Sequence, residues 1–165
     1  MNLYFTSEGF LLPISKIQID LPTFEQIFVS GFPNSVTRPR LWANYQAFIQ
    51  RFEQRVTSHF VQWINGSFVT QKENPNDIDL ITFIDYSIFE PMEAEQYFEE
   101  FWSYNLEKEG LDSYLLGVYP PEHAKYSKYQ KYCHDWYIKY CNAKQQQTIL
   151  ENVKGFIELK FNLSS

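Results

Sequence analysis

The run Ile78 to Ile84, of sequence IDLITFI, most constrains how this chain can fold. It is mostly apolar and rich in β-branched residues, which is typical of a buried strand. Residues 61–66, 113–119 and 155–161 are also predicted to be strands, each bounded by glycine or proline. Strands like these form a sheet whose apolar residues must be covered by helices.

Apolar residues at helical spacing predict those helices. Residues 39–60 give the strongest pattern, and residues 122–142 give another. We expect a surface helix over residues 87–110, closed by Gly110, and a short helix capped by Thr23 and Gln26. The order of elements predicts one α/β or α+β domain over residues 1–165, in which helices lie mainly on one side of the sheet and residues 1–22 form an extended arm.

The charge balance excludes one broad class of ligand. The chain has 20 acidic and 14 basic residues, a formal net charge of −6, which argues against a general grip on duplex DNA. No apolar run approaches the length of a membrane span, so we expect a cytoplasmic protein without a membrane partner. Cys133 and Cys141 lie eight residues apart in a predicted helix and are expected to be free thiols.

Two acidic residues stand at the start of the buried run. Asp77 and Asp79 are two residues apart, so an extended backbone would point both carboxylates to one face. Neighbouring carboxylates repel each other unless a cation pairs them, and Mg²⁺ prefers oxygen ligands together with substrate phosphates. The pair therefore predicts a site for Mg²⁺ or Mn²⁺.

A Gly-Ser step precedes these acids by ten residues. Gly66 allows a close approach of the backbone to a ligand, and Ser67 offers a hydroxyl and an N–H donor for phosphate. Lys72, in the intervening loop, is either a phosphate contact or, more simply, a solvated loop lysine. Each feature alone is common, and only the combination at this spacing indicates a site.

The string GSFVTQKENPNDID, residues 66–79, resembles the active-site loop of the nucleotidyltransferase superfamily that includes polymerase beta and the minimal nucleotidyltransferases. The wider string NGSFVTQKENPNDIDL is similar to uncharacterised bacterial proteins assigned to that fold. The resemblance extends to Gly9–Pro13 and to Lys154–Ile157, so it runs through the chain, although only its central motif is specific.

The resemblance implies a nucleotidyltransferase-like fold and the transfer of a nucleoside monophosphate from a triphosphate to an acceptor hydroxyl. Asp77 and Asp79 would then hold two metal ions, and Ser67 would bind the terminal phosphates. Superfamily members usually add a third carboxylate as metal ligand and general base. We expect Asp112 in this role rather than Asp85, because Asp85 stands at the far end of the strand that begins near Asp79.

Several alternatives stay open at this stage. The acceptor is expected to be a protein or an RNA, possible settings include toxin–antitoxin and phage-defence pairs with a partner protein, and the same cleft would serve an inactive binding module. The tyrosines and lysines of residues 125–140 are either a core stripe with a solvated basic edge, which we favour, or a platform for bases. His123 and His134 lack the spacing of a zinc site.

Overall fold

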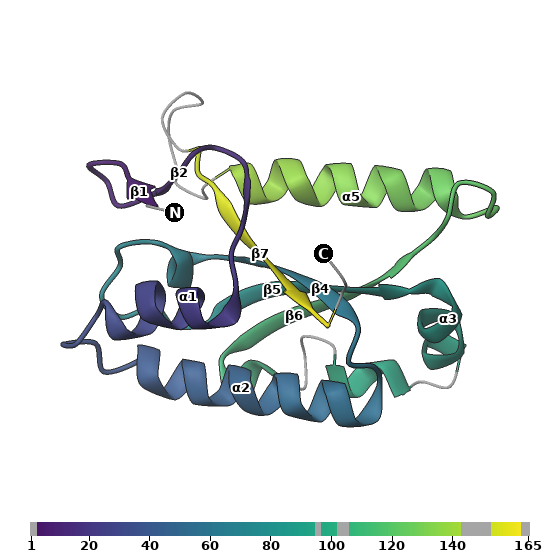
Figure 1. Ribbon diagram of the computed structural model, residues 1–165, viewed down its shortest axis with the longest axis horizontal. Coiled ribbons are helices and arrows are strands. Elements are labelled where there is room, and N and C mark those ends of the chain that lie inside the picture. The colour runs from purple at the N-terminus through teal and green to yellow at the C-terminus, as the bar shows by residue number, and fades with distance from the viewer. Residues whose placement is uncertain (1–2, 95–96, 102–105, 143–152, 163–165) are drawn as a thin grey trace.

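A five-stranded mixed sheet forms the centre of the computed structural model, which describes residues 3–94, 97–101, 106–142 and 153–162 (Figure 1). The strand order is β3-β7-β4-β5-β6, and β1 and β2 make a separate hairpin. The strands are β1 (Tyr4–Phe5), β2 (Leu11–Leu12), β3 (Lys16–Gln18), β4 (Phe60–Asn65), β5 (Ile78–Asp85), β6 (Leu111–Val118) and β7 (Phe156–Phe161). The predicted α/β class with a mixed sheet is confirmed.

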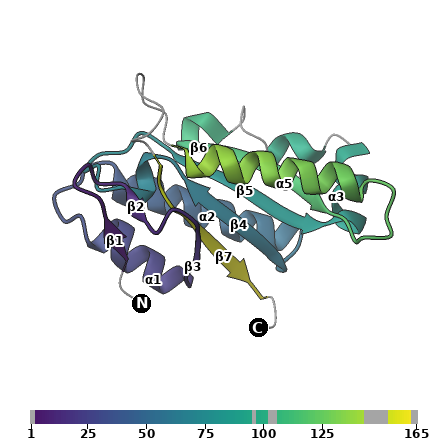
Figure 2. The same cartoon turned by 90° about the horizontal axis from the view of Figure 1, so that it is seen from above.

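Helices cover both faces of this sheet (Figures 1 and 2). The described α-helices are α1 (Leu21–Glu25), α2 (Arg38–Arg55), α3 (Tyr86–Ala94) and α5 (Tyr126–Cys141). Aromatic and aliphatic side chains of α1, α2 and α3 share one core cluster with the sheet, whereas α5 is the described helix that packs on the opposite face. The prediction that helices lie mainly on one side is therefore correct, with α5 as the exception.

The alternation of side chains along β5 explains why most residues of its sequence are apolar. Leu80 and Ile84 belong to the core under α2, while Ile81 and Phe83 belong to the cluster under α5. Since successive side chains of a strand point to opposite faces, a strand covered on both faces must be apolar at nearly every position.

Three predicted boundaries were wrong. The expected helix over residues 87–110 is α3 followed by two 3₁₀ turns, Tyr97–Phe101 and Glu107–Glu109, while residues 95–96 and 102–105 lie outside the described residues. The short helix is capped by the carboxylate of Asp20, which accepts from the Thr23 amide, rather than by Thr23. Finally, α2 ends at Arg55, and Phe60 already begins β4.

The arm and the helix α5 agree with the remaining predictions. The arm contains three short strands, of which β3 pairs in parallel with β7 and so joins the main sheet. Both cysteines are free thiols in α5.

None of the described helices is long and apolar enough to cross a membrane.

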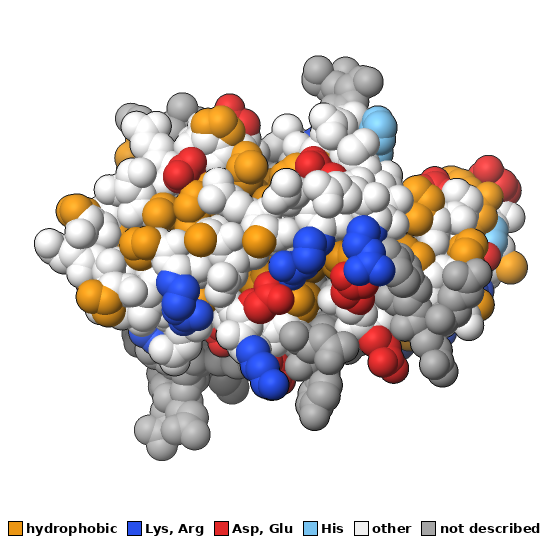
Figure 3. Space-filling model, turned by 90° about the horizontal axis from the view of Figure 1, so that it is seen from below, with side chains coloured by type: hydrophobic (Ala, Val, Ile, Leu, Met, Phe, Trp, Pro, Cys, Tyr) orange, Lys and Arg blue, Asp and Glu red, His pale blue; other side chains and the backbone are white. Residues whose placement is uncertain are grey.

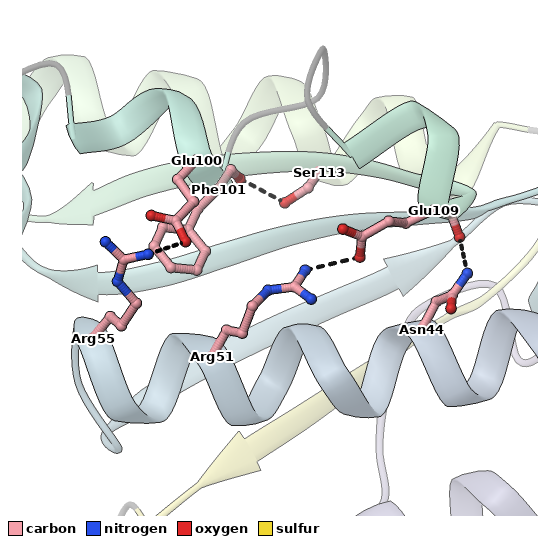
Figure 4. A network of polar contacts seen from close by, with 7 residues as sticks. All are labelled: Asn44, Arg51, Arg55, Glu100, Phe101, Glu109 and Ser113. Atoms are coloured by element: carbon pink, nitrogen blue, oxygen red, sulfur yellow. Dashed lines mark hydrogen bonds and ion pairs between the residues drawn. The ribbon is translucent and has the colours of Figure 1, made fainter.

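Polar contacts from α2 fix the segment that leads into β6 (Figure 4). The Asn44 side chain donates to the Glu109 carbonyl at 2.7 Å, and Arg51 pairs with the Glu109 carboxylate at 2.8 Å. One turn further along α2, Arg55 pairs with Glu100. These contacts come from one rigid helix, so they set where β6 begins.

The outer face of the α2 layer carries charges of both signs. Figure 3 shows lysine and arginine side chains next to aspartate and glutamate over the described part of this face. Mixed charges of this kind hold little attraction for a phosphate backbone. This face therefore gives no support to duplex binding.

The buried side chain of Arg38 ties the loop after β4 to the helical layer. Its guanidinium donates to the carbonyls of Phe28, Phe68, Thr70 and Lys72 at 2.6–2.9 Å. Arg38 has no exposed surface, and burial lowers its pKa to about 10, so it still carries its charge at neutral pH. The guanidinium lies 3.7 Å from the centroid of the Phe32 ring.

Replacing Arg38 by methionine is expected to destabilise the protein strongly. The change leaves four carbonyls without their donor, and removing the donor from a buried acceptor costs about 1–3 kcal/mol each, although relaxation and water entry reduce the sum. We expect the free energy of unfolding in urea to fall by about 3 kcal/mol or more. Arg40→Met removes the same charge from an exposed position of the same helix, and a comparable loss in that control would contradict this explanation.

Candidate functional site

A pocket of about 780 Å³ opens at one edge of the sheet. Strands β3, β5, β6 and β7 begin at this edge and β4 ends there, as their pairing requires. The walls come from the arm near Gly9, from the loop after β4 and from the last turns of α5. All six predicted site residues line this pocket: Gly66, Ser67, Lys72, Asp77, Asp79 and Asp112.

Strand register brings three polar residues side by side at the pocket floor. Asn65 of β4 pairs with Asp79 of β5, and Asp79 pairs with Asp112 of β6. Paired residues of neighbouring strands lie about 5 Å apart and point to the same face, here the face under α5. The structure therefore brings Asp112 beside Asp79, as the sequence predicted, while Asp85 lies at the opposite end of β5 and accepts from Ser87.

Gly66 is required by the close approach of Asp79. Its φ of +75° is a conformation that side chains disfavour, and a Cβ at this position would overlap Oδ2 of Asp79 and lie 2.8 Å from its Cγ. Without a Cβ, the backbone lies directly against the carboxylate. The Gly-Ser step thus fixes the Asp79 side chain as well as starting the next turn.

Ser67 begins a single 3₁₀ turn, Ser67–Val69, that leads into the loop held by Arg38. The Thr70 hydroxyl donates to the Ser67 carbonyl at 2.7 Å, which stabilises this turn. Lys72 is exposed at the pocket rim, and its amide donates to the Thr70 hydroxyl. The turn keeps Ser67 at the pocket wall, while the hydrogen bonds of Lys72 within the described residues are made by its backbone amide and carbonyl.

Lys154, which precedes β7, is a cation that lies beside this step. The residue Lys154 is 5% exposed, and its ammonium donates to the Gly66 carbonyl at 2.9 Å. Burial lowers its pKa to about 8, and the negative charge of Asp79 opposes this shift. The antiparallel pairing of β4 with β7 would have indicated this neighbour, because it joins the end of one strand to the start of the other.

The last turns of α5 form an aromatic wall of the pocket. The Trp136 ring lies 4.7 Å from the Tyr114 ring, and the Lys139 ammonium lies 3.9 Å from the Trp136 ring centroid. Tyr129, Cys133 and Tyr137 instead pack on the sheet. The predicted core stripe therefore forms most of this helix face, and its end also reaches the pocket.

Two buried polar atoms beside the pocket have no partner among the described residues: Oδ1 of Asn65 and the hydroxyl of Tyr140. The Asn65 side-chain NH₂ group donates to the Tyr140 carbonyl at 3.1 Å, so the atom of the Asn65 side chain without a partner is Oδ1. Burial raises the pKa of Tyr140 well above its ordinary value, and Asp79 and Asp112 raise it further. Buried polar atoms normally have partners, and an exception at a pocket indicates a place where polar partners arrive from outside the chain.

A family model described as a family of unknown function, DUF6932, matches residues 3–160. This chain belongs to that family. Comparison with curated proteins and with solved structures finds no match.

The acids of this DUF6932 chain suit one divalent cation better than several. Asp79 and Asp112 stand side by side, and Mg²⁺ is commonly held by one or two carboxylates plus substrate oxygens. Asp77 precedes β5 and is exposed at the rim. Across the described ranges, no group of three or more histidine, cysteine, aspartate or glutamate side chains is arranged to hold one ion.

Substituting Gly66 by alanine is expected to destabilise this DUF6932 chain by about 2 kcal/mol, through the positive φ and the overlap with Asp79. The matched change Ser67→Ala should leave stability nearly unaltered, because the Ser67 hydroxyl makes no hydrogen bond within the described residues. Chemical unfolding of both variants tests this, and equal stabilities would contradict the proposed close approach.

The lowered pKa of Lys154 should appear in the pH dependence of stability. Its pKa is about 8 when folded and 10.5 ordinarily, so between these pH values the unfolded state binds the proton more tightly. The native protein should therefore gain stability relative to Lys154→Met as the pH rises from 8 to 10, by about 2 kcal/mol. Urea unfolding of both proteins at several pH values measures this, and a constant difference would show an ordinary lysine.

Proposed function

We propose that this protein is a magnesium-dependent nucleotidyltransferase that transfers a nucleoside monophosphate from a triphosphate to an acceptor hydroxyl. One observation carries the proposal: Asp79 and Asp112, side by side on two strands, share one pocket with the Gly66–Ser67 step. The resemblance of residues 66–79 to the nucleotidyltransferase superfamily supports the same chemistry.

The carboxylates of Asp79 and Asp112 would hold Mg²⁺, or Mn²⁺, together with phosphate oxygens of the nucleotide. Bound there, the ion supplies charge neutralisation and alignment of the reacting phosphate. Asp77 lies at the rim, where it would contact a metal–nucleotide complex from the solvent side. The contribution of these acids is mainly to position the triphosphate and to balance its charge.

The two ends of the pocket differ in chemistry and so orient the nucleotide. Ser67, Lys72 and Lys154 offer a hydroxyl and two positive charges near the Gly-Ser step, which suits the terminal phosphates. Tyr114 and Trp136 offer half-buried rings at the other end, where the Lys139 ammonium lies over the Trp136 ring, and a base would stack on these rings in place of that ammonium. Tyr114 is two residues beyond Asp112 on the same face of β6, so a sugar would span the interval.

In the reaction, the acceptor hydroxyl oxygen bonds to the α-phosphorus while the bond from that phosphorus to the pyrophosphate oxygen breaks. The hydroxyl proton passes to a carboxylate, for which Asp112 is the best placed. Pyrophosphate then leaves toward the open rim near Lys72. A protein or RNA acceptor, or a partner protein that presents one, fits a pocket that opens at the edge of the sheet.

A catalytically inactive module that binds a nucleotide or a partner in the same pocket is the second candidate. It is favoured by the absence, in the described part of the chain, of a group of three acidic side chains around one point. The nucleotidyltransferase needs the pocket to bind a triphosphate and to release pyrophosphate, whereas the inactive module needs only to bind a nucleotide or a partner.

Binding and turnover distinguish these functions. We expect calorimetry with ATP, GTP, CTP and UTP to show binding of at least one of them that requires Mg²⁺, and we expect pyrophosphate release with a suitable acceptor. Asp79→Asn and Asp112→Asn should each lower that release by about 100-fold or more.

Asp85→Asn is the matched control, because it removes the same charge at the opposite end of β5 and should leave turnover unchanged. Metal-dependent binding without pyrophosphate release would favour the inactive module. No binding of any triphosphate would refute the nucleotidyltransferase and the nucleotide-binding form of the inactive module.

A further inference from the structure

The proposed chemistry needs positive charge on two sides of the triphosphate, and the resemblance implies two metal ions for this. The metal-ligating side chains of the described residues do not suffice for two metal ions. Asp79 and Asp112 are paired across β5 and β6, but Asp77 is exposed at the rim, and no third acidic, histidine or cysteine side chain of the described ranges completes a cluster with them. The protein therefore presents carboxylates for one ion and has to obtain the second positive charge in another way.

The Lys154 side chain provides a positive charge beside Gly66 in the pocket. Its ammonium donates to the carbonyl of Gly66, and the α-carbon of Gly66 lies against the Asp79 carboxylate. The residue is buried, with an exposed fraction of 5%. A lysine at the pocket surface for solubility alone would extend into water, whereas this one is buried and donates to the Gly66 carbonyl.

The backbone that carries the Lys154 side chain is hydrogen-bonded to two distant segments. The Lys154 amide donates to the Cys141 carbonyl at the end of α5, at 3.0 Å. The next amide, of Gly155, donates to the Leu11 carbonyl in the arm, at 2.6 Å. Two distant segments thus fix the backbone at this point and the Gly66 carbonyl accepts from the ammonium, which is the arrangement expected of a preorganised group.

Burying an ammonium is costly unless a negative charge or several acceptors compensate for it. Here Asp79 lies close enough to favour the charged form. An ammonium has three N–H donors, and the Gly66 carbonyl accepts one of them. The geometry is suited to an ammonium that bridges the Gly-Ser step, the acidic pair and an incoming phosphate.

We propose that the Lys154 ammonium takes the position of the second metal ion, so that the site binds a single divalent cation between Asp79 and Asp112. This inference rests on the proposed function, because it concerns the same pocket and the same triphosphate. It assigns a specific task to Lys154: neutralising the phosphates on the side of Gly66 and Ser67, while the one divalent ion acts on the side of Asp112.

The number of bound metal ions tests the proposal directly in the intact chain. Mn²⁺ binding is measured by electron paramagnetic resonance at a saturating concentration of a non-hydrolysable triphosphate analogue, using the nucleotide class that binds. We expect one Mn²⁺ per chain at saturation. Two Mn²⁺ per chain would overturn the proposal while leaving the proposed function intact.

A charge substitution gives an independent test with a defined direction. In Lys154→Met, a positive charge next to Asp79 is lost, so Mn²⁺ in the absence of nucleotide should bind about tenfold more tightly or better. The triphosphate analogue should bind about tenfold more weakly, because a buried contact to phosphate is lost. A lysine with only a structural role would change neither affinity in a folded variant.

Lys128→Met is the matched control, since it removes the same charge from an exposed position of α5 outside the pocket and should change neither affinity. Equal Mn²⁺ affinities in Lys154→Met and Lys128→Met would overturn the proposal. If Lys154→Met does not fold, the stoichiometry of the native chain decides alone. If native protein binds neither Mn²⁺ nor nucleotide, the proposed function fails together with this inference.

Discussion

The buried guanidinium of Arg38 is the interaction on which the architecture of the site depends. The loop between β4 and β5 has no strand or long helix to hold it, yet its carbonyls at Phe68, Thr70 and Lys72 all accept from this one side chain. Arg38 belongs to the first turn of α2, and its fourth acceptor lies in the π-helical turn Gln26–Ser30. A planar group with five donors can join these segments, whereas a lysine ammonium could not match the same geometry. The loop is therefore as rigid as the layer beneath it, and Ser67 keeps its position at the pocket wall.

The sheet provides the second half of the site by register alone. Asn65, Asp79 and Asp112 belong to three strands and lie in one row because β4 is antiparallel and β6 parallel to β5. The start of β6 is in turn set by α2, through Asn44 and Arg51 (Figure 4). One helix thus positions the loop from its first turn and the third acid from its middle. Displacing α2 would move both sides of the pocket together.

The pocket contains nearly as many lysines as acidic residues, although the protein as a whole is acidic. Three aspartates and Glu8 line it, and Lys72, Lys139 and Lys154 oppose them. The three lysines differ in environment: Lys72 is exposed, Lys139 lies over the Trp136 ring, and Lys154 is buried against Gly66. Only a buried cation keeps its interaction energy when ligand and water exchange around it, because solvent screens the others. This difference is why Lys154, rather than the lysines of the rim, enters the account of the metal site.

The sequence by itself determined the class of fold, the strands and the central motif. Periodicity identified β5 and α2 because a strand buried on both faces and a helix with one apolar face each leave a local pattern. The Gly66–Asp79 motif could also be found in the sequence, because its residues lie within one short segment. The break after α3 was missed because the apolar residues of 97–101 occur at a spacing that a 3₁₀ turn and an α-helix nearly share. Only the tertiary structure decided which distant residues complete the pocket. Strand pairing placed Asp112 beside Asp79, and the antiparallel contact of β4 with β7 placed Lys154 beside Gly66. Those neighbours are 33 and 88 residues apart in sequence, and no local pattern encodes a contact that depends on the order of strands in a sheet.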